Sequence, residues 1–263
     1  DDELYEAFAE ATGIRVNVVE ADADQLIERI KAEGANSPAD LLMTVDAGRL
    51  WRAQQEDIFE SVDSSVLTEA VPENLRHPDG LWFGLTKRAR VIMYNKDAVD
   101  PSELSTYEDL VDPKWRGRIL VRTSNNIYNQ SLVGSLIAAH GSDETEDWAR
   151  GFVANFAREP EGNDTAQIKS AAAGLGDIAI ANTYYLARLA RSEDPADQEV
   201  ADKMRVFFPN HDDGGTHVNI SGAGVIKTAP HPEAAIQFLE FLVSPEAQEI
   251  FANSNNEYPV VEG

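Results

Sequence analysis

The chain has 263 residues, with 46 Asp and Glu against 22 Lys and Arg, so its formal net charge is −24. This charge repels nucleic acids and other phosphate-rich partners. The absence of Cys excludes disulfides, thiolate metal sites and thiol nucleophiles. Apolar residues make up 43% of the chain, which is enough for a buried core in one large domain or in each of two lobes.

The acidity and the small number of lysines are typical of proteins from salty habitats, and we expect a halophilic or salt-tolerant source. No apolar run is long enough to cross a bilayer, and no signal peptide precedes residue 1. Because Asp1 is not a natural initiator, we expect that a leader has been removed.

The first part of the chain alternates predicted helices and strands. Apolar spacing predicts a helix over 2–12, a strand over 15–20, a helix over 24–33 and a strand over 40–45, after which Asp46 caps another helix. This alternation predicts mostly parallel sheets with helices on both faces.

The same alternation continues to the end of the chain. Strands are predicted over 90–95, 118–122, 177–181 and 204–208. Helices are predicted over 131–140, 143–156, 164–173, 184–191, 232–243 and 245–253. Two α/β regions without a long linker predict a two-lobed protein, with a ligand site in the cleft between the lobes at the carboxyl ends of strands.

Motifs of common enzyme classes are absent from the sequence. There is no nucleophile elbow, no zinc-protease motif and no P-loop, and the five His have no metal-ligand spacing. The segment 174–179 loosely fits a dinucleotide-binding loop, but it precedes a strand where such a loop should follow one. We therefore expect a protein that is not an enzyme.

Three tyrosines stand where strands end and helices begin. Tyr184 and Tyr185 follow the buried strand 177–181, and Tyr128 lies in a polar loop after 118–122. A phenol is neutral at pH 7, but a highly charged cation can displace its proton. Hard ferric iron suits the resulting anionic oxygen, so these phenols favour Fe(III) over zinc or copper. Taken singly, each tyrosine also fits an ordinary packing role.

Six segments together resemble the ferric iron-binding proteins of ABC transporters, which have the two-lobed type II periplasmic-binding-protein fold. The segments are 39–50, 82–90, 126–131, 181–185, 217–224 and 255–260, and the resemblance covers almost the whole chain. It implies an α/β fold in which each lobe is a mostly parallel sheet flanked by helices. The expected lobes are 1–89 with 217–263, and 90–216, with hinge crossings near 86–91 and 216–223.

The resemblance also implies a site. Its metal ligands fall on the three tyrosines, namely Tyr128, Tyr184 and Tyr185. The family often adds a carbonate-like anion, for which the matching candidates are Arg88, with Arg90 as the alternate, Asn129 and Ser131. Two residues of the first lobe, Thr44 and Asp46, are expected to line the cleft.

Two departures from the family pattern concern the same site. Relatives usually begin with a strand that carries a Tyr or His ligand, and here residue 1 already lies at the first helix. Leu186 stands where many relatives have a third consecutive Tyr.

The resemblance implies a periplasmic or extracytoplasmic monomer that captures Fe(III) and delivers it to an ABC permease without inserting into the membrane. Two alternatives stay open. The same fold could bind a small organic or anionic solute, on which Tyr184 and Tyr185 would stack without ionising. A hydrolase could use two of the many carboxylates, and it would show paired acids with a raised pKa.

Overall fold

The computed structural model describes residues 2–261, and the chain divides into two compact units. Unit 1 contains the chain up to Lys87 and from Asn219 onward, and unit 2 contains Arg88–Val218. Each unit combines strands with flanking helices, which confirms the expected α/β class. No helix in the described part of the chain is long and apolar enough to cross a membrane.

Unit 1 packs helices around the strand order β1–β6–β2, with β7 also paired to β2. Its strands are β1 (Leu41–Val45), the first part of β2 (Phe83–Asn95), β6 (Val218–Val225) and β7 (Tyr258–Pro259). Its helices are α1 (Asp2–Thr12), α2 (Ala23–Glu33), α3 (Ala47–Gln55), α4 (Ser65–Ala70), α10 (Pro232–Leu242) and α11 (Pro245–Ile250), with short helices η1 (Gly34–Asn36), η2 (Glu73–Leu75) and η6 (Phe251–Asn255). Phe8 of α1 and Phe238 of α10 join the core, with ring centroids 4.9 Å apart.

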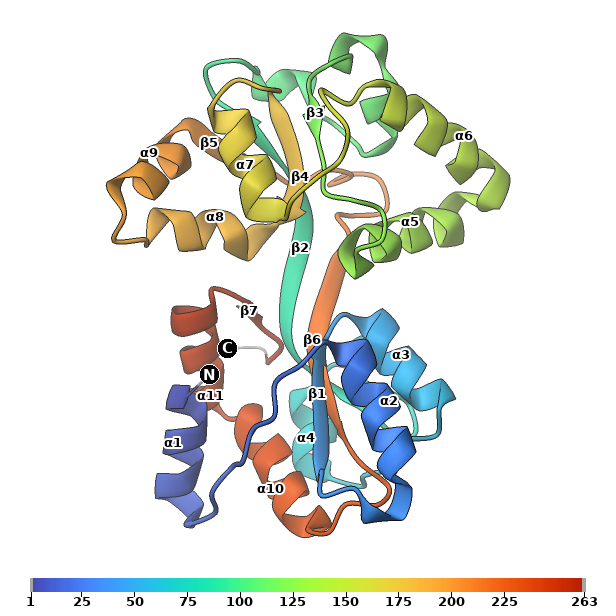
Figure 1. Ribbon diagram of the computed structural model, residues 1–263, viewed down its shortest axis with the longest axis vertical. Helices are drawn as coiled ribbons and strands as arrows, with labels where there is room; N and C mark the ends of the chain where they lie inside the picture. The colour runs from blue at the N-terminus through green and yellow to red at the C-terminus, as the bar shows by residue number, and fades with distance from the viewer. Residues whose placement is uncertain (1, 262–263) are drawn as a thin grey trace. The chain divides into compact units, whose positions relative to one another are not determined.

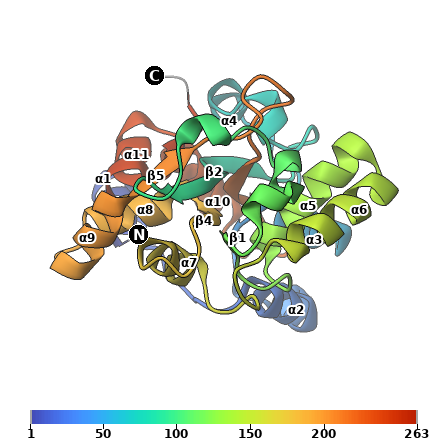
Figure 2. The ribbon, with the colours of Figure 1, turned by 90° about the horizontal axis from the view of Figure 1, so that it is seen from above.

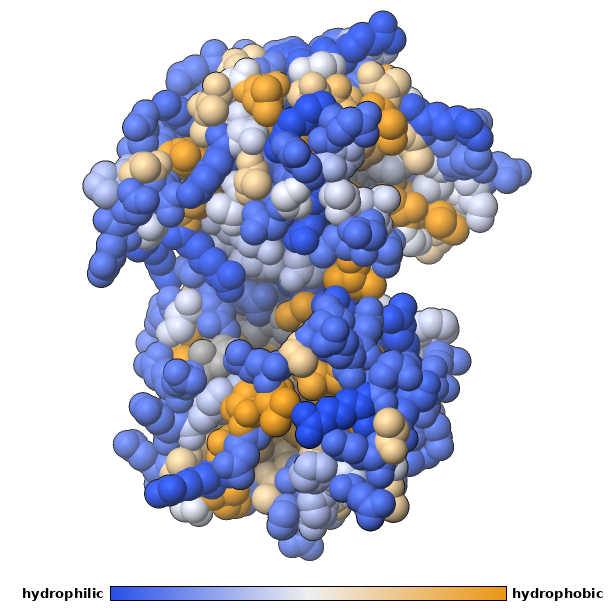
Figure 3. Space-filling model, viewed as in Figure 1, coloured by the Kyte–Doolittle hydropathy of each residue, from blue (hydrophilic) through white to orange (hydrophobic). Residues whose placement is uncertain are grey.

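The strand predicted over 15–20 is not formed. No strand is assigned to this segment, and Val18 and Val19 are 46% and 60% exposed. Figure 3 shows apolar surface over the segment between α1 and α2. β-branched residues favour a strand only when a neighbouring strand supplies hydrogen bonds and packing, and no such partner is paired with this segment.

Close packing beside β6 predicts that substitutions at two glycines will change the stability of the protein by different amounts. A Cβ at Gly224 would stand 2.3 Å from the Leu81 carbonyl oxygen and 2.6 Å from the Phe59 ring, whereas a Cβ at Gly134, in the helix Ile127–His140, meets nothing within 4 Å. We expect Gly224→Ala to lower the free energy of unfolding by about 1–3 kcal/mol. Gly134→Ala should be neutral or stabilising by up to about 1 kcal/mol. Urea unfolding of both variants measures the difference. Equal losses in the free energy of unfolding would show that Leu81 and Phe59 can move to make room for a methyl group at position 224.

Unit 2 surrounds the strand order β2–β4–β3, with β5 also paired to β2. Its strands are the second part of β2, β3 (Ile119–Leu120), β4 (Ile178–Asn182) and β5 (Met204–Phe207). Its helices are α5 (Ile127–His140), α6 (Ser142–Ala154), α7 (Asp164–Ala172), α8 (Thr183–Ala190) and α9 (Pro195–Lys203), with short helices η3 (Pro101–Glu103), η4 (Glu108–Val111) and η5 (Pro113–Trp115). In two views α8 and α9 lie on one side of β4, and α5 and α6 on the other (Figures 1 and 2).

The predicted direction of the sheets needs a correction. Only β3 and β4 pair in parallel among the registers that are defined for the described strands, while β1–β6, β2–β4, β2–β5 and β2–β7 pair antiparallel. A strand–helix–strand alternation gives parallel pairing only when the two strands that flank the helix become neighbours. Here β2 belongs to both units, and its neighbours come from distant parts of the chain.

The parallel pair of β3 and β4 positions the tyrosines. Because β3 and β4 run in the same direction, their carboxyl ends lie at one edge of the sheet, where α5 and α8 begin. The helix predicted over 131–140 begins earlier, at Ile127, because Asn126 caps it by accepting a hydrogen bond from the Tyr128 N–H. Tyr128 therefore lies in the first turn of α5 and not in a loop.

Candidate functional site

Three tyrosines from two helix starts meet in unit 2. Tyr128 is in the first turn of α5, and Tyr184 and Tyr185 are in the first turn of α8. The Tyr184 Oη donates to the Tyr128 Oη at 3.3 Å, and the ring centroids of Tyr184 and Tyr185 are 4.4 Å apart. The structure thus brings together the three residues that the sequence proposes as metal ligands.

The spacing of the two bonded phenols suits a shared cation. Two oxygens that each lie about 2 Å from one ion, at about a right angle, are about 3 Å apart. The 3.3 Å between the oxygens of Tyr128 and Tyr184 is close to this separation. Each phenol also stands at a helix N-terminus, where the helix dipole favours negative charge.

Burial keeps two of these phenols protonated when the site is empty. Loss of hydration raises the pKa of Tyr184, which is 5% exposed, and the neighbouring Tyr128 and Tyr185 raise it further. Loss of hydration also raises the pKa of Tyr185, against a smaller opposing effect of its hydrogen bond with Tyr184. A ligand that requires phenolates must therefore displace protons.

Guanidinium groups surround the tyrosines. The Cζ atoms of Arg88, Arg90 and Arg122 lie 5.7, 5.9 and 5.6 Å from the centroid of the Tyr128 ring. The Cζ of Arg188 lies 4.7 Å from the centroid of the Tyr184 ring. Such distances place each cation within reach of the ring, and the positive charge favours a negatively charged group nearby.

Arg90 is committed to contacts inside the protein. It is 1% exposed and forms a salt bridge at 2.9 Å with Asp164, which is fully buried. It also donates to the side-chain oxygens of Asn182 at 3.1 Å and of Asn129 at 2.7 Å. The amide nitrogen of Asn129 in turn donates to the backbone carbonyls of Arg122 and Thr123.

The other residues proposed for an anion or for the cleft lie in different surroundings. Arg88, 2% exposed, is on β2, and Ser131 is one turn beyond Tyr128 on α5. Thr44 and Asp46 belong to unit 1, whereas the three tyrosines belong to unit 2. Asp46 caps α3 by accepting from the Gly48 N–H at 3.0 Å, as predicted.

The sequence did not single out Asp164, Arg122 or Arg188. The local sequence places Asp164 in the first turn of a helix, where an acidic residue is commonly on the surface. Arg122 is the last residue of the predicted strand 118–122, and its position at the strand end was the available signal for it. The burial of Asp164 depends on Arg90, which is 74 residues away along the chain.

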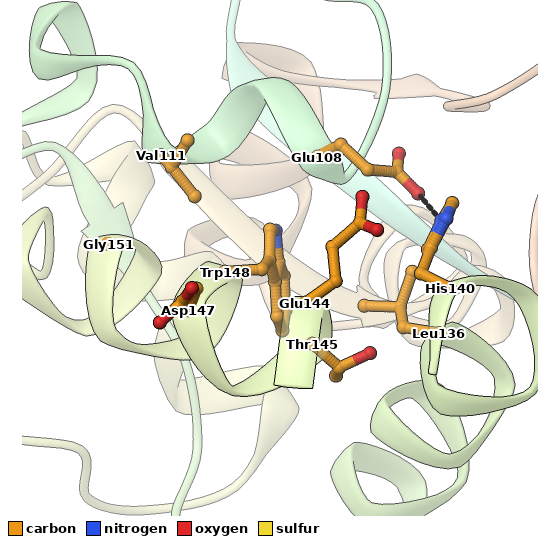
Figure 4. A pocket seen from close by; sticks show the side chains of 9 residues that line it. All are labelled: Glu108, Val111, Leu136, His140, Glu144, Thr145, Asp147, Trp148 and Gly151. Carbon is orange, nitrogen blue, oxygen red and sulfur yellow. Dashed lines mark hydrogen bonds and ion pairs between the residues drawn. The ribbon is translucent and has the colours of Figure 1, made fainter. Parts of the chain in front are cut away.

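A separate cavity of about 470 Å³ lies among η4, α5 and α6 (Figure 4). Trp148 and Leu136 are among its lining residues, and Glu108 forms an ion pair at 2.8 Å with His140. Burial tends to raise the pKa of Glu108, but hydrogen bonds from Asn210 and His140 are among those that outweigh it, and its net pKa is lowered.

This cavity supports neither a carboxylate metal site nor a hydrolase. Within residues 2–261 no group of three or more His, Asp or Glu side chains is arranged to hold a metal ion. A catalytic acid needs a raised pKa, and the pKa of Glu108 moves in the opposite direction. The tyrosine cluster is the stronger candidate site.

Comparisons with known proteins agree on one family. The sequence profile of a family described as bacterial extracellular solute-binding protein matches residues 36–263. Iron uptake protein A1 of Synechocystis sp. PCC 6803 is 60% identical over 263 residues, which is all of this chain and 73% of that protein. Iron uptake protein A2 of the same organism is 62% identical over 265 residues, covering all of this chain and 75% of that protein.

A solved structure gives the same result. The Trichodesmium protein IdiA (FutA), in complex with iron and citrate ligands, is 65% identical and has a TM-score of 0.97. The alignment covers all of this chain and 83% of that one. This likeness confirms the fold expected from the resemblance.

Proposed function

The chain belongs to the bacterial extracellular solute-binding protein family, and we propose that it captures Fe(III) through the phenolates of Tyr128, Tyr184 and Tyr185. The relatives named as iron uptake proteins support an iron cargo. The complex of the Trichodesmium protein with iron and citrate supports a ferric site with an organic anion. Binding and transport need no chemical step, so the proposed role is not enzymatic.

The observation that carries this proposal is the convergence of the phenols from two helices. Tyr128 and Tyr184 come from segments 56 residues apart, yet their oxygens are 3.3 Å apart, and the ring of Tyr185 packs against that of Tyr184 at an interplanar angle of 38°. Core packing alone would not require two hydroxyl groups to face each other. Anionic oxygen is the donor that hard ferric iron prefers, and the described residues offer no competing cluster of His, Asp and Glu.

The charges around the site favour a second, anionic ligand. Three phenolates balance the three charges of Fe(III), and the Cζ atoms of Arg88, Arg90 and Arg122 lie 5.6–5.9 Å from the Tyr128 ring centroid. Positive charge so close to the proposed ligands favours an anion such as citrate or carbonate. Arg88 and Ser131 stay the proposed contacts for it on the basis of the sequence resemblance, whereas Arg90 and Asn129 bond to each other.

We place the protein in the periplasm as a monomer that delivers iron to a membrane permease of the ABC type. The family description supports a location outside the cytoplasm. Thr44 and Asp46 stay predicted as residues near the bound ligand, on the basis of the sequence resemblance alone.

The test is a titration of the metal-free protein with ferric citrate, followed by visible absorption. We expect a phenolate-to-iron charge-transfer band that saturates near one iron per chain. Tyr128→Phe, Tyr184→Phe and Tyr185→Phe should each weaken binding by about a hundredfold or more, since each removes a metal ligand. The double variant at Tyr184 and Tyr185 should lose the band.

Tyr94→Phe is the matched control for the removal of a hydroxyl group. Tyr94 lies on β2 in the same unit, and its neighbours are those of the unit 2 core. It should keep both the band and the affinity. A wild-type protein that binds iron without a visible band, or an organic anion in its place, would refute the proposal.

A further inference from the structure

The side chain of Asn182 is used in an unusual way. This residue stands at the N-cap of α8, where an Asn side chain ordinarily accepts a hydrogen bond from the helix backbone. Asn182 makes no such bond, although it is only 2% exposed. Its amide instead accepts from Arg90 and donates to the Tyr184 oxygen, so its two polar atoms join a cation to a proposed ligand.

The sheet register produces this contact. Arg90 of β2 and Asn182 of β4 are direct partners in the antiparallel pair, so their side chains emerge side by side on one face. The salt bridge to Asp164 holds the guanidinium in place from the other side. Arg90 is therefore fixed by the sheet and by α7, and it also bonds to Asn129 of α5.

Arg90 also determines which group donates in the hydrogen bonds from Asn182 to Tyr184 and from Tyr184 to Tyr128. A guanidinium has donors and no acceptor, so the Asn182 atom that faces it at 3.1 Å must be the carbonyl oxygen. The amide nitrogen then faces the Tyr184 oxygen at 3.3 Å and donates to it. The Tyr184 hydroxyl is left to donate to Tyr128.

We propose that Asn182, oriented by Arg90, is a positioning residue that supplies a hydrogen-bond donor to the Tyr184 phenolate in the iron-loaded protein. The inference rests on the proposed function, because it needs Tyr184 to be a ligand. On iron binding Tyr184 gives up its proton, and the N–H of Asn182 then meets a negative oxygen. Such charge-assisted bonds are stronger than neutral ones, and outer partners of this kind tune metal ligands.

The test is a double-mutant cycle between Asn182→Ala and Tyr184→Phe, read by iron affinity in competition with citrate and by the position of the charge-transfer band. In the wild-type background Asn182→Ala should lower the affinity by about ten- to a hundredfold. It should also move the band to longer wavelength, because a phenolate without its N–H donor gives up an electron more easily. In the Tyr184→Phe background, which lacks the oxygen, Asn182→Ala should change neither quantity.

Two further variants separate this role from a general effect on folding. Asn182→Asp keeps the shape and the acceptor for Arg90 but removes the donor, and it should weaken binding at least as much as Asn182→Ala. Asn155→Ala removes another amide of unit 2 that is also 2% exposed and bonds only to the backbone carbonyls of Leu110 and Asp112. It should leave the band unmoved even where it lowers thermal stability.

The possible failures are distinct. If Tyr184→Phe by itself leaves the band and the affinity unchanged, Tyr184 is not a ligand, and the proposed tyrosine site and this inference fall together. If Tyr184→Phe weakens binding but Asn182→Ala costs the same in both backgrounds, Asn182 acts without Tyr184 and only this inference is overturned. If Asn182→Ala leaves the charge-transfer band unmoved, only this inference is overturned as well.

Discussion

Iron affinity should rise steeply with pH, by about two to three orders of magnitude per pH unit near neutrality. Burial raises the pKa of Tyr184 and of Tyr185 in the empty site, so both are fully protonated at pH 7. Phenols in general hold their protons at this pH. Iron binds the deprotonated form, so each phenolate ligand releases one proton on binding, and lower pH weakens binding.

A comparison of two proteins isolates this effect from the titration of citrate itself. Wild type and Tyr184→Phe are loaded from the same ferric citrate solution, and the protons released per iron are measured with a pH indicator. The wild type should release one proton more than the variant, and its affinity should depend on pH with a correspondingly steeper slope. Equal proton release would mean that Tyr184 stays neutral in the complex, as expected of an organic solute that stacks on the ring.

Asp164→Asn should destabilise unit 2 by about 3–5 kcal/mol. The carboxylate of Asp164 is fully buried, pairs with Arg90 at 2.9 Å and faces Arg122 at 3.8 Å. Its neutralisation leaves the Arg90 guanidinium, 1% exposed, without a counter-charge, and an uncompensated buried charge is strongly destabilising. Segment-resolved hydrogen exchange measures the loss through the protection of amides in β4 and α7.

Asp177→Asn is the control with the same chemical change in the same unit. Asp177 pairs with Arg118, but the two side chains are 25% and 24% exposed, so water can solvate both charges once the pair is broken. This variant should lose about 1 kcal/mol or less. A similar loss in both variants would show that burial of the Asp164 pair has no special cost.

Because a helix depends on neighbours three and four residues apart, local patterns predicted most of the helices, though not α4 or α9. Apolar spacing placed α1 at 2–12 and nearly all of α2 correctly. The same reasoning failed for 15–20, where the valines have strand propensity but no partner strand. It also put Tyr128 in a loop, because the cap at Asn126 looked like part of a polar turn.

The roles of the arginines could not be predicted in the same way. The resemblance offered Arg88, with Arg90 as the alternate, for holding an anion, and local patterns offered no further means to separate the two. The structure shows that Arg90 bonds to Asp164, Asn182 and Asn129, which are 74, 92 and 39 residues away. No local pattern carries information about partners at such separations.

The sequence by itself determined the chemistry that the chain can offer: phenols and guanidinium groups without thiols, with each tyrosine placed where a predicted strand gives way to a helix. Only the tertiary structure decided how these groups meet. The parallel pairing of β3 with β4 brings the starts of α5 and α8 together, and the antiparallel pairing of β2 with β4 sets Arg90 opposite Asn182. Both pairings join segments that are distant along the chain, so they depend on long-range hydrogen bonding and packing, which residue spacing does not encode.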